Sequence, residues 1–104
     1  MRTRQLGDTG LELTTVGFGT WAIGGPWQFG WGPQDDSEAI RAILAGLEQG
    51  INWIDTAPIY GLGHSEELVG KALKQTTIRP IIATKCGLLW NCLLYTSDAA
   101  DEGV

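Results

Sequence analysis

The chain has 104 residues, enough for one small domain, and its net charge of −5 argues against nucleic-acid binding, which needs a basic face. No apolar run approaches the roughly 18 residues of a bilayer-spanning helix, and no secretory signal follows the basic N-terminus, so we expect no membrane association. Cys86 and Cys92 match no metal-ligand spacing. We therefore expect no metal site, and reduced thiols in a cytoplasmic protein.

The chain is predicted to open with a β-hairpin and a core strand. Extended segments at residues 4–6 and 11–14 flank Gly7-Asp8-Thr9-Gly10, a composition typical of hairpin turns. Residues 15–20 follow as a first core strand. Residues 21–33 cannot form a helix, because glycines and prolines interrupt every turn. Their aromatic side chains either lie over the core or form a wall beside a ligand pocket. They are Trp21, Trp27, Phe29 and Trp31.

A helix is predicted after Asp35. This residue can cap the helix, and Glu38 falls at the capping-box position three residues later. Apolar residues then recur at helical spacing, at Ile40, Ile43, Leu44 and Leu47. Gly50 stands where a left-handed residue ends a helix.

A strand at residues 51–54, a helix capped by Ser65 and a strand at residues 81–84 complete the pattern. Strands that alternate with helices pair in parallel through right-handed crossovers. A closed (β/α)8 barrel needs about 250 residues. We therefore expect an α/β fold that is an incomplete TIM barrel, with a hairpin, about three strands and two helices. The longer protein that would contain it is called the parent protein below.

Three polar side chains lie at or just beyond the ends of the predicted strands: Asp55, Tyr60 and Lys85. The carboxyl ends of parallel strands meet at one edge, so we expect a common mouth. A phenol is a slow acid at neutral pH, and a neighbouring ammonium strengthens it by favouring phenolate. A lysine held by an acid next to a tyrosine suits protonation of a carbonyl oxygen during reduction. Spacing alone also leaves structural roles open for each residue. Asp55 could cap the following turn, Tyr60 could be a packed aromatic, and Lys85 could be a solvated strand end.

The stretch Asp55–Gly70 resembles the first signature of the aldo-keto reductases. Gly17–Trp21 resembles the end of that family's first strand, and Thr84–Gly87 the end of its third. The likeness runs from about Arg4 to Trp90. It is nearest the bacterial general-stress and sugar-reductase-like branches.

The resemblance implies a (β/α)8 barrel that reduces small aldehydes and ketones to alcohols with NADPH, or less often NADH. Tyr60 would donate the proton, Lys85 would be its partner, and Asp55 the counter-ion of the lysine. Thr20 and Trp21, with Asp55, would lie at the nicotinamide and substrate. The family's catalytic histidine follows its next strand. The single histidine here, His64, lies on another loop, and we interpret it as a surface or near-cap residue.

Residues 92–104 resemble a translated transposon adapter of the kind used to prepare sequencing libraries. We expect residues 1–91 to be the N-terminal part of an NADP-dependent oxidoreductase domain, inactive alone, and residues 92–104 to be a non-native tail. A genuine C-terminal strand and turn is the alternative. The substrate, the oligomeric state and the choice between NADPH and NADH are not readable from this segment.

Three other hypotheses stay open. A non-catalytic, cofactor-binding accessory subunit of an ion channel would share the fold and the three residues. A standalone small domain would need no further strands. Residues 17–22 also match the G-x-G-x-x-A dinucleotide fingerprint, but that motif needs a helix opening at its glycines, which residues 21–33 do not favour.

Overall fold

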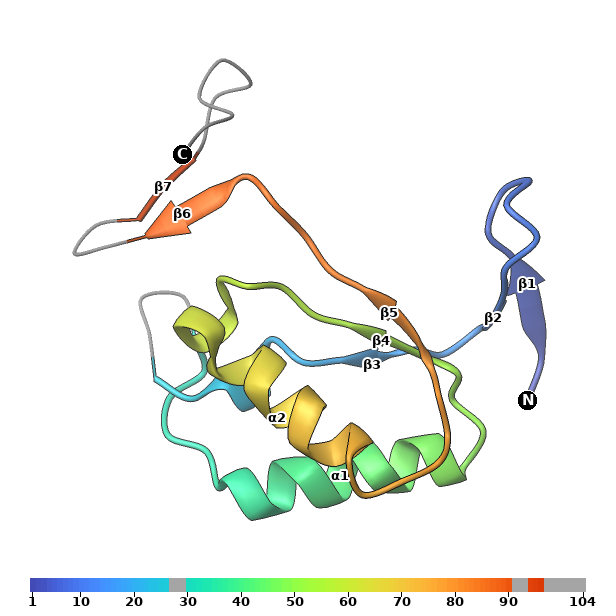
Figure 1. Cartoon of the computed structure of the whole chain (residues 1–104), viewed down its shortest axis with the longest axis horizontal. Helices are drawn as coiled ribbons and strands as arrows, with labels where there is room; N and C mark the ends of the chain where they lie inside the picture. The colour runs from blue at the N-terminus through green and yellow to red at the C-terminus, as the bar shows by residue number, and fades with distance from the viewer. Residues whose placement is uncertain (27–29, 91–93, 97–104) are drawn as a thin grey trace.

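The computed structural model describes residues 1–26, 30–90 and 94–96, with side chains as far as residue 87. Its centre is a parallel three-stranded sheet in the order β3-β4-β5. The strands are β3 (Phe18–Gly19), β4 (Trp53–Asp55) and β5 (Ile81–Ala83). The crossovers contain α1 (Asp36–Glu48) and α2 (His64–Leu73), and both helices lie on the same side of the sheet (Figure 1). The predicted strand–helix alternation is therefore confirmed.

The hairpin is also confirmed. β1 (Thr3–Gln5) pairs antiparallel with β2 (Glu12–Thr14), and both glycines of the connecting turn have positive φ. The hairpin is tied to the start of β4, because the Trp53 indole N–H donates to the Thr14 carbonyl at 2.9 Å. It lies beyond the amino ends of the parallel strands (Figure 1), opposite the edge where their carboxyl ends meet.

Helix α1 forms as predicted from local signals. The Glu38 backbone N–H donates to Asp35 Oδ1 at 3.1 Å, and Gly50 has φ +102° just beyond the helix. Ile43 and Leu47 are buried, with Ile40 and Leu44 packed at the edge of the core. The buried cluster joins both helices to the central strand and consists of Ile43, Leu47, Ile54, Val69 and Ala72.

Several predicted boundaries were wrong. Ser65 does not cap α2: the helix begins at His64 after Gly63, whose φ is +101°, and Ser65 lies buried in its first turn. The Ser65 hydroxyl is instead directed at a neighbouring strand end, where it donates to the Thr20 carbonyl. The first core strand pairs over two residues only, because the backbone beyond them turns into the short 3-10 helix η1 (Ala22–Gly24). The strand predicted at residues 51–54 pairs over Trp53–Asp55.

The described chain ends in a second antiparallel pair, β6 (Leu88–Trp90) and β7 (Leu94–Thr96), which is separate from the central sheet (Figure 1). β7 falls inside the expected tail, and the rest of that segment lies outside the described residues. Trp27 and Phe29 of the aromatic loop also lie outside them. Within the described ranges, no helix has the length and apolarity needed to cross a bilayer.

Candidate active site

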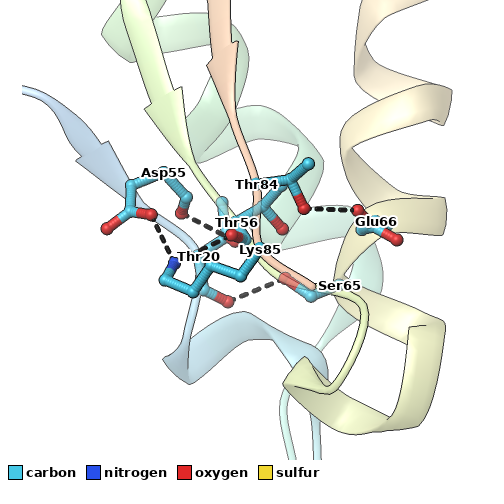
Figure 2. Close-up of polar contacts among 7 residues, drawn as sticks. All are labelled: Thr20, Asp55, Thr56, Ser65, Glu66, Thr84 and Lys85. Carbon is cyan, nitrogen blue, oxygen red and sulfur yellow. Dashed lines mark hydrogen bonds and ion pairs between the residues drawn. The ribbon is translucent and has the colours of Figure 1, made fainter. Parts of the chain in front are cut away.

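Asp55 and Lys85 meet at the carboxyl ends of neighbouring strands. Asp55 is the last residue of β4 and pairs with Ala83 of β5. Lys85 follows Ala83 by two residues and therefore lies just beyond the same end of the sheet. The Lys85 Nζ donates to Asp55 Oδ1 at 2.6 Å and to the Thr56 carbonyl at 2.9 Å (Figure 2). The parallel register therefore brings together two residues that are 30 positions apart in the chain.

Tyr60 joins them from the loop between β4 and α2. It is the first residue of the 3-10 segment η2 (Tyr60–Gly63), and its half-buried ring lies with its centroid 4.9 Å from the Lys85 Nζ. A cation at this distance is attracted by the aromatic face. The structure thus brings the three predicted catalytic residues together, with Asp55 and Tyr60 next to the ammonium group of Lys85.

The electrostatics of this group centre on Lys85. Burial acts to lower the pKa of its ammonium, but hydrogen bonds with Asp55 and Tyr60, and their charges, outweigh burial and raise the pKa above the ordinary 10.5. Lys85 is therefore a cation at neutral pH. Its side chain is 50% exposed and that of Asp55 is 45% exposed, so both are accessible from solvent.

Thr20 and Trp21, the other predicted site residues, have different surroundings. Thr20 is fully buried, and both its backbone N–H and its hydroxyl donate to the Asp55 carbonyl, at 3.0 and 3.1 Å. Its side chain is therefore bonded to the backbone at the end of β4. Trp21 is 41% exposed, and its ring centroid lies 5.7 Å from that of Trp31, which is 69% exposed. Both indoles are exposed, and neither belongs to the buried core cluster.

Two glycines allow the loop that carries Tyr60 to pack closely against the loop after β3. Gly61 has φ +60°, and a Cβ added there would stand 2.0 Å from the Gly24 carbonyl oxygen. A Cβ on Gly24 would stand 2.8 Å from the Gly61 nitrogen. The backbones of η1 and η2 therefore touch, which places Tyr60 relative to the end of β3. Sequence reasoning missed this contact, and the density of glycines in both loops was its only signal.

Sequence reasoning also missed four residues around the site. Thr56 offers its carbonyl to Lys85, while its own hydroxyl is buried and has no partner in the described structure. On α2, Ser65 holds Thr20, and the next residue, Glu66, accepts a hydrogen bond from the Thr84 hydroxyl at 2.9 Å. Both α2 residues stood in the recognised motif, but they were interpreted only as helix-terminal signals.

His64 lies apart from this constellation, as expected. Its Nε2 is 2.8 Å from Asp36 Oδ1, so it joins the first turns of the two helices, and its side chain is 34% exposed. A cavity of about 80 Å³ adjoins Lys85 and is lined also by Ala57, Pro58, Ile59 and Cys86. In the described part of the chain, no three His, Cys, Asp or Glu side chains gather as a metal-binding group.

Comparison with known proteins identifies the family of this arrangement. The model of the aldo/keto reductase family matches residues 15–103. The chain is 50% identical over 92 residues to an aldo-keto reductase, YhdN, of Bacillus subtilis, and 44% identical over 93 residues to an NADH-specific methylglyoxal reductase of Escherichia coli. Each comparison covers 86% of this chain, but only 27% and 28% of the relatives. The chain thus spans under a third of the length of these relatives.

Solved structures agree. The chain matches a glycerol dehydrogenase of Gluconobacter oxydans with a TM-score of 0.77 at 44% identity, covering 91% of this chain and 30% of that one. It matches an aldo-keto reductase of Bacillus halodurans with a TM-score of 0.73 at 37% identity, covering 88% and 28%. These structures are (β/α)8 barrels, and the present fold is a partial one. The chain therefore belongs to the aldo/keto reductase family.

Proposed function

We propose that the parent protein reduces small aldehydes and ketones to alcohols, with NADPH, or alternatively NADH, as the reductant and with Tyr60 as the proton donor. The observation that carries this proposal is the position of Lys85, whose Nζ contacts the Asp55 carboxylate at 2.6 Å and faces the Tyr60 ring. The names of two relatives, a methylglyoxal reductase and a glycerol dehydrogenase, support a small carbonyl or alcohol as substrate.

The proton transfer follows from this geometry. Reduction of a carbonyl group to an alcohol requires a hydride at the carbon and a proton at the oxygen, and Tyr60 would supply the proton. The Lys85 ammonium, 4.9 Å from the centroid of the Tyr60 ring, puts a positive charge beside the residue that would lose the proton. Asp55 balances the charge of the lysine and holds it in place. Positioned acids of this kind contribute about 10²–10⁴ in rate.

The residues present fit a nicotinamide at this edge. When bound, the cofactor supplies the hydride. The Asp55 carboxylate is half exposed and can accept hydrogen bonds from hydroxyl groups, while the exposed Trp21 indole offers an aromatic face. Thr20 would contribute to cofactor binding indirectly, because its hydroxyl donates to the Asp55 carbonyl and so holds the backbone of Asp55 in place. We propose Thr20, Trp21 and Asp55 as this segment's contribution to cofactor binding. The proposed compartment is the cytoplasm.

We further propose that residues 1–91 are the N-terminal part of the parent domain, and that residues 92–104 are not native. The short coverage of the relatives supports the first proposal. The family match runs to residue 103, so it includes most of the tail and makes the genomic reading frame decisive. A frame that continues past Trp90 with a different sequence supports the proposal. A frame that encodes residues 92–104 and then stops contradicts it.

The activity is tested with purified parent protein, methylglyoxal, and NADPH or NADH in separate assays. Steady loss of nicotinamide absorbance that requires the carbonyl compound supports the reductase. Stoichiometric cofactor binding without turnover, for a panel of aldehydes and ketones, would instead support the channel-accessory hypothesis. Equilibrium binding measured by fluorescence separates that result from a protein that simply fails to bind the cofactor.

A further inference from the structure

We propose that Glu66 is a positioning residue: through its hydrogen bond with Thr84, it sets the backbone from which Lys85 reaches Asp55 and Tyr60. This inference rests on the proposed function of the same site. Among the described residues, the hydrogen bond of the Glu66 side chain is with Thr84, so we expect its effect on the reaction to pass through Thr84.

The first observation is the way in which the end of β5 is held. Thr84 and Lys85 are consecutive, and in Figure 2 their side chains extend to opposite sides of the chain. Thr84 donates to Glu66 Oε2 at 2.9 Å on the helix side, while Lys85 donates to Asp55 and Thr56 on the other. A residue anchored on one side fixes the origin of the long, flexible side chain that follows it.

The second observation concerns the residues just beyond β5. β5 pairs with β4, and the last backbone hydrogen bond between the two runs from the Thr56 N–H to the Ala83 carbonyl at 2.8 Å. Thr84, Lys85 and Cys86 lie past that bond and are exposed. The Thr84 hydroxyl therefore holds the chain at a point past the last backbone hydrogen bond of the described sheet.

The third observation is that two consecutive residues of α2 hold two different strand ends. Ser65 donates to the carbonyl of Thr20, just beyond β3, and Glu66 accepts from Thr84, just beyond β5. Thr20 in turn donates twice to the carbonyl of Asp55. The first turn of α2 is thus linked by hydrogen bonds to the backbone near both members of the Asp55–Lys85 ion pair, through Thr20 on one side and Thr84 on the other.

Glu67 provides a matched control. It is the next residue of the same helical turn, carries the same charge and is more exposed, and its described ion-pair contact is with His64 Nδ1 at 3.7 Å. Glu66→Ala and Glu67→Ala remove the same charge from the positive end of the helix dipole. A difference between the two variants therefore reports the bond to Thr84.

The experiment compares Thr84→Val, Thr84→Ser, Glu66→Ala and Glu67→Ala in the parent protein. Thr84→Val keeps the shape and removes the donor, while Thr84→Ser keeps the donor. We expect kcat to fall about tenfold in Thr84→Val and Glu66→Ala, with little change in KM, because small displacements of catalytic groups cost up to ~10²-fold. Thr84→Ser and Glu67→Ala should stay near wild type. The Glu66→Ala, Thr84→Val double variant should be no worse than either single variant, because both remove one bond.

A second readout does not depend on turnover. Trace labelling with acetic anhydride, quantified by mass spectrometry at Lys85, should be faster in Thr84→Val and Glu66→Ala than in wild type and Glu67→Ala, because a displaced Lys85 loses the bonds that favour its protonated form. Wild-type labelling in Thr84→Val would overturn the inference, as would equal effects of Glu66→Ala and Glu67→Ala. If the parent protein shows no reductase activity, the labelling result still decides the inference about Glu66.

Discussion

At the scale of single residues, Lys85 connects the parts of the site. Its side chain contacts the end of β4, through Asp55 and Thr56, and also the loop residue Tyr60. Both members of its ion pair are about half exposed, so the pair contributes little to folding stability, under about 1 kcal/mol. Stabilisation of the fold therefore does not account for this arrangement.

The raised pKa of Lys85 predicts a specific dependence of stability on pH. The stabilisation from the protonated lysine is fully present below its unfolded-state pKa, near 10.5, and is lost as the pH rises through the higher folded-state pKa. Lys85→Met should therefore lower the free energy of unfolding of the parent protein at pH 8, by less than about 1 kcal/mol, and the deficit should shrink above pH 10.5.

Urea unfolding of wild type and variant, measured in steps from pH 8 to 11.5, checks this prediction. Lys71→Met, on the exposed face of α2, controls for the general effect of replacing a lysine. A deficit that stays constant across the whole range would show that Lys85 stabilises the fold by packing and not by charge.

At the scale of elements, the contact between η1 and η2 positions Tyr60. Gly61→Ala should be costly, because the added Cβ meets the Gly24 carbonyl and alanine is strained at φ +60°. We expect a loss of about 1–3 kcal/mol in the free energy of unfolding and a fall in kcat, as Tyr60 shifts with its loop.

Gly70→Ala is the matched control. Gly70 lies in α2 with open space where its Cβ would be, so this variant should gain about 0.5–1 kcal/mol and keep wild-type kcat. Chemical denaturation and steady-state kinetics of the two variants test the pair. Wild-type stability and kcat in Gly61→Ala would contradict the close approach of the two loops.

The elements also show which features were predictable. Helix α1 was foreseen with its cap and its buried stripe, because both depend on residues within one or two turns. The start of α2 was not, because the partner of Ser65 is Thr20, 45 positions earlier in the chain. The same holds for Gly24 and Gly61. Local spacing carries information about caps and periodicity, whereas contacts between loops depend on how the strands are arranged.

The site divides in the same way. Asp55, Tyr60 and Lys85 were predictable as a set, because each follows a strand signal and parallel strands end at one edge. The Thr56 carbonyl and the Glu66–Thr84 bond were not, because the first depends on the register of β4 against β5 and the second on where α2 lies relative to the end of β5.

At the scale of the whole molecule, the described fold is open. Both helices lie on one side of a three-stranded sheet, and Ile82 on the edge strand β5 is 42% exposed. Exposed strand edges promote association between chains. We therefore expect the 104-residue chain, expressed alone, to aggregate or to form a molten species, and the parent protein to unfold cooperatively. Dispersed amide NMR signals and a sharp two-state melt of the 104-residue chain would establish a standalone domain instead.

The proton-donor role of Tyr60 is tested most directly by kcat of the parent protein after Tyr60→Phe, with nicotinamide affinity measured in the same samples. The substitution keeps the ring that faces the Lys85 ammonium and removes only the hydroxyl. We predict a fall in kcat of at least about 100-fold, with cofactor affinity unchanged within about twofold. A variant that keeps wild-type kcat would contradict the role assigned to Tyr60, and with it the function proposed for the Asp55–Lys85–Tyr60 group.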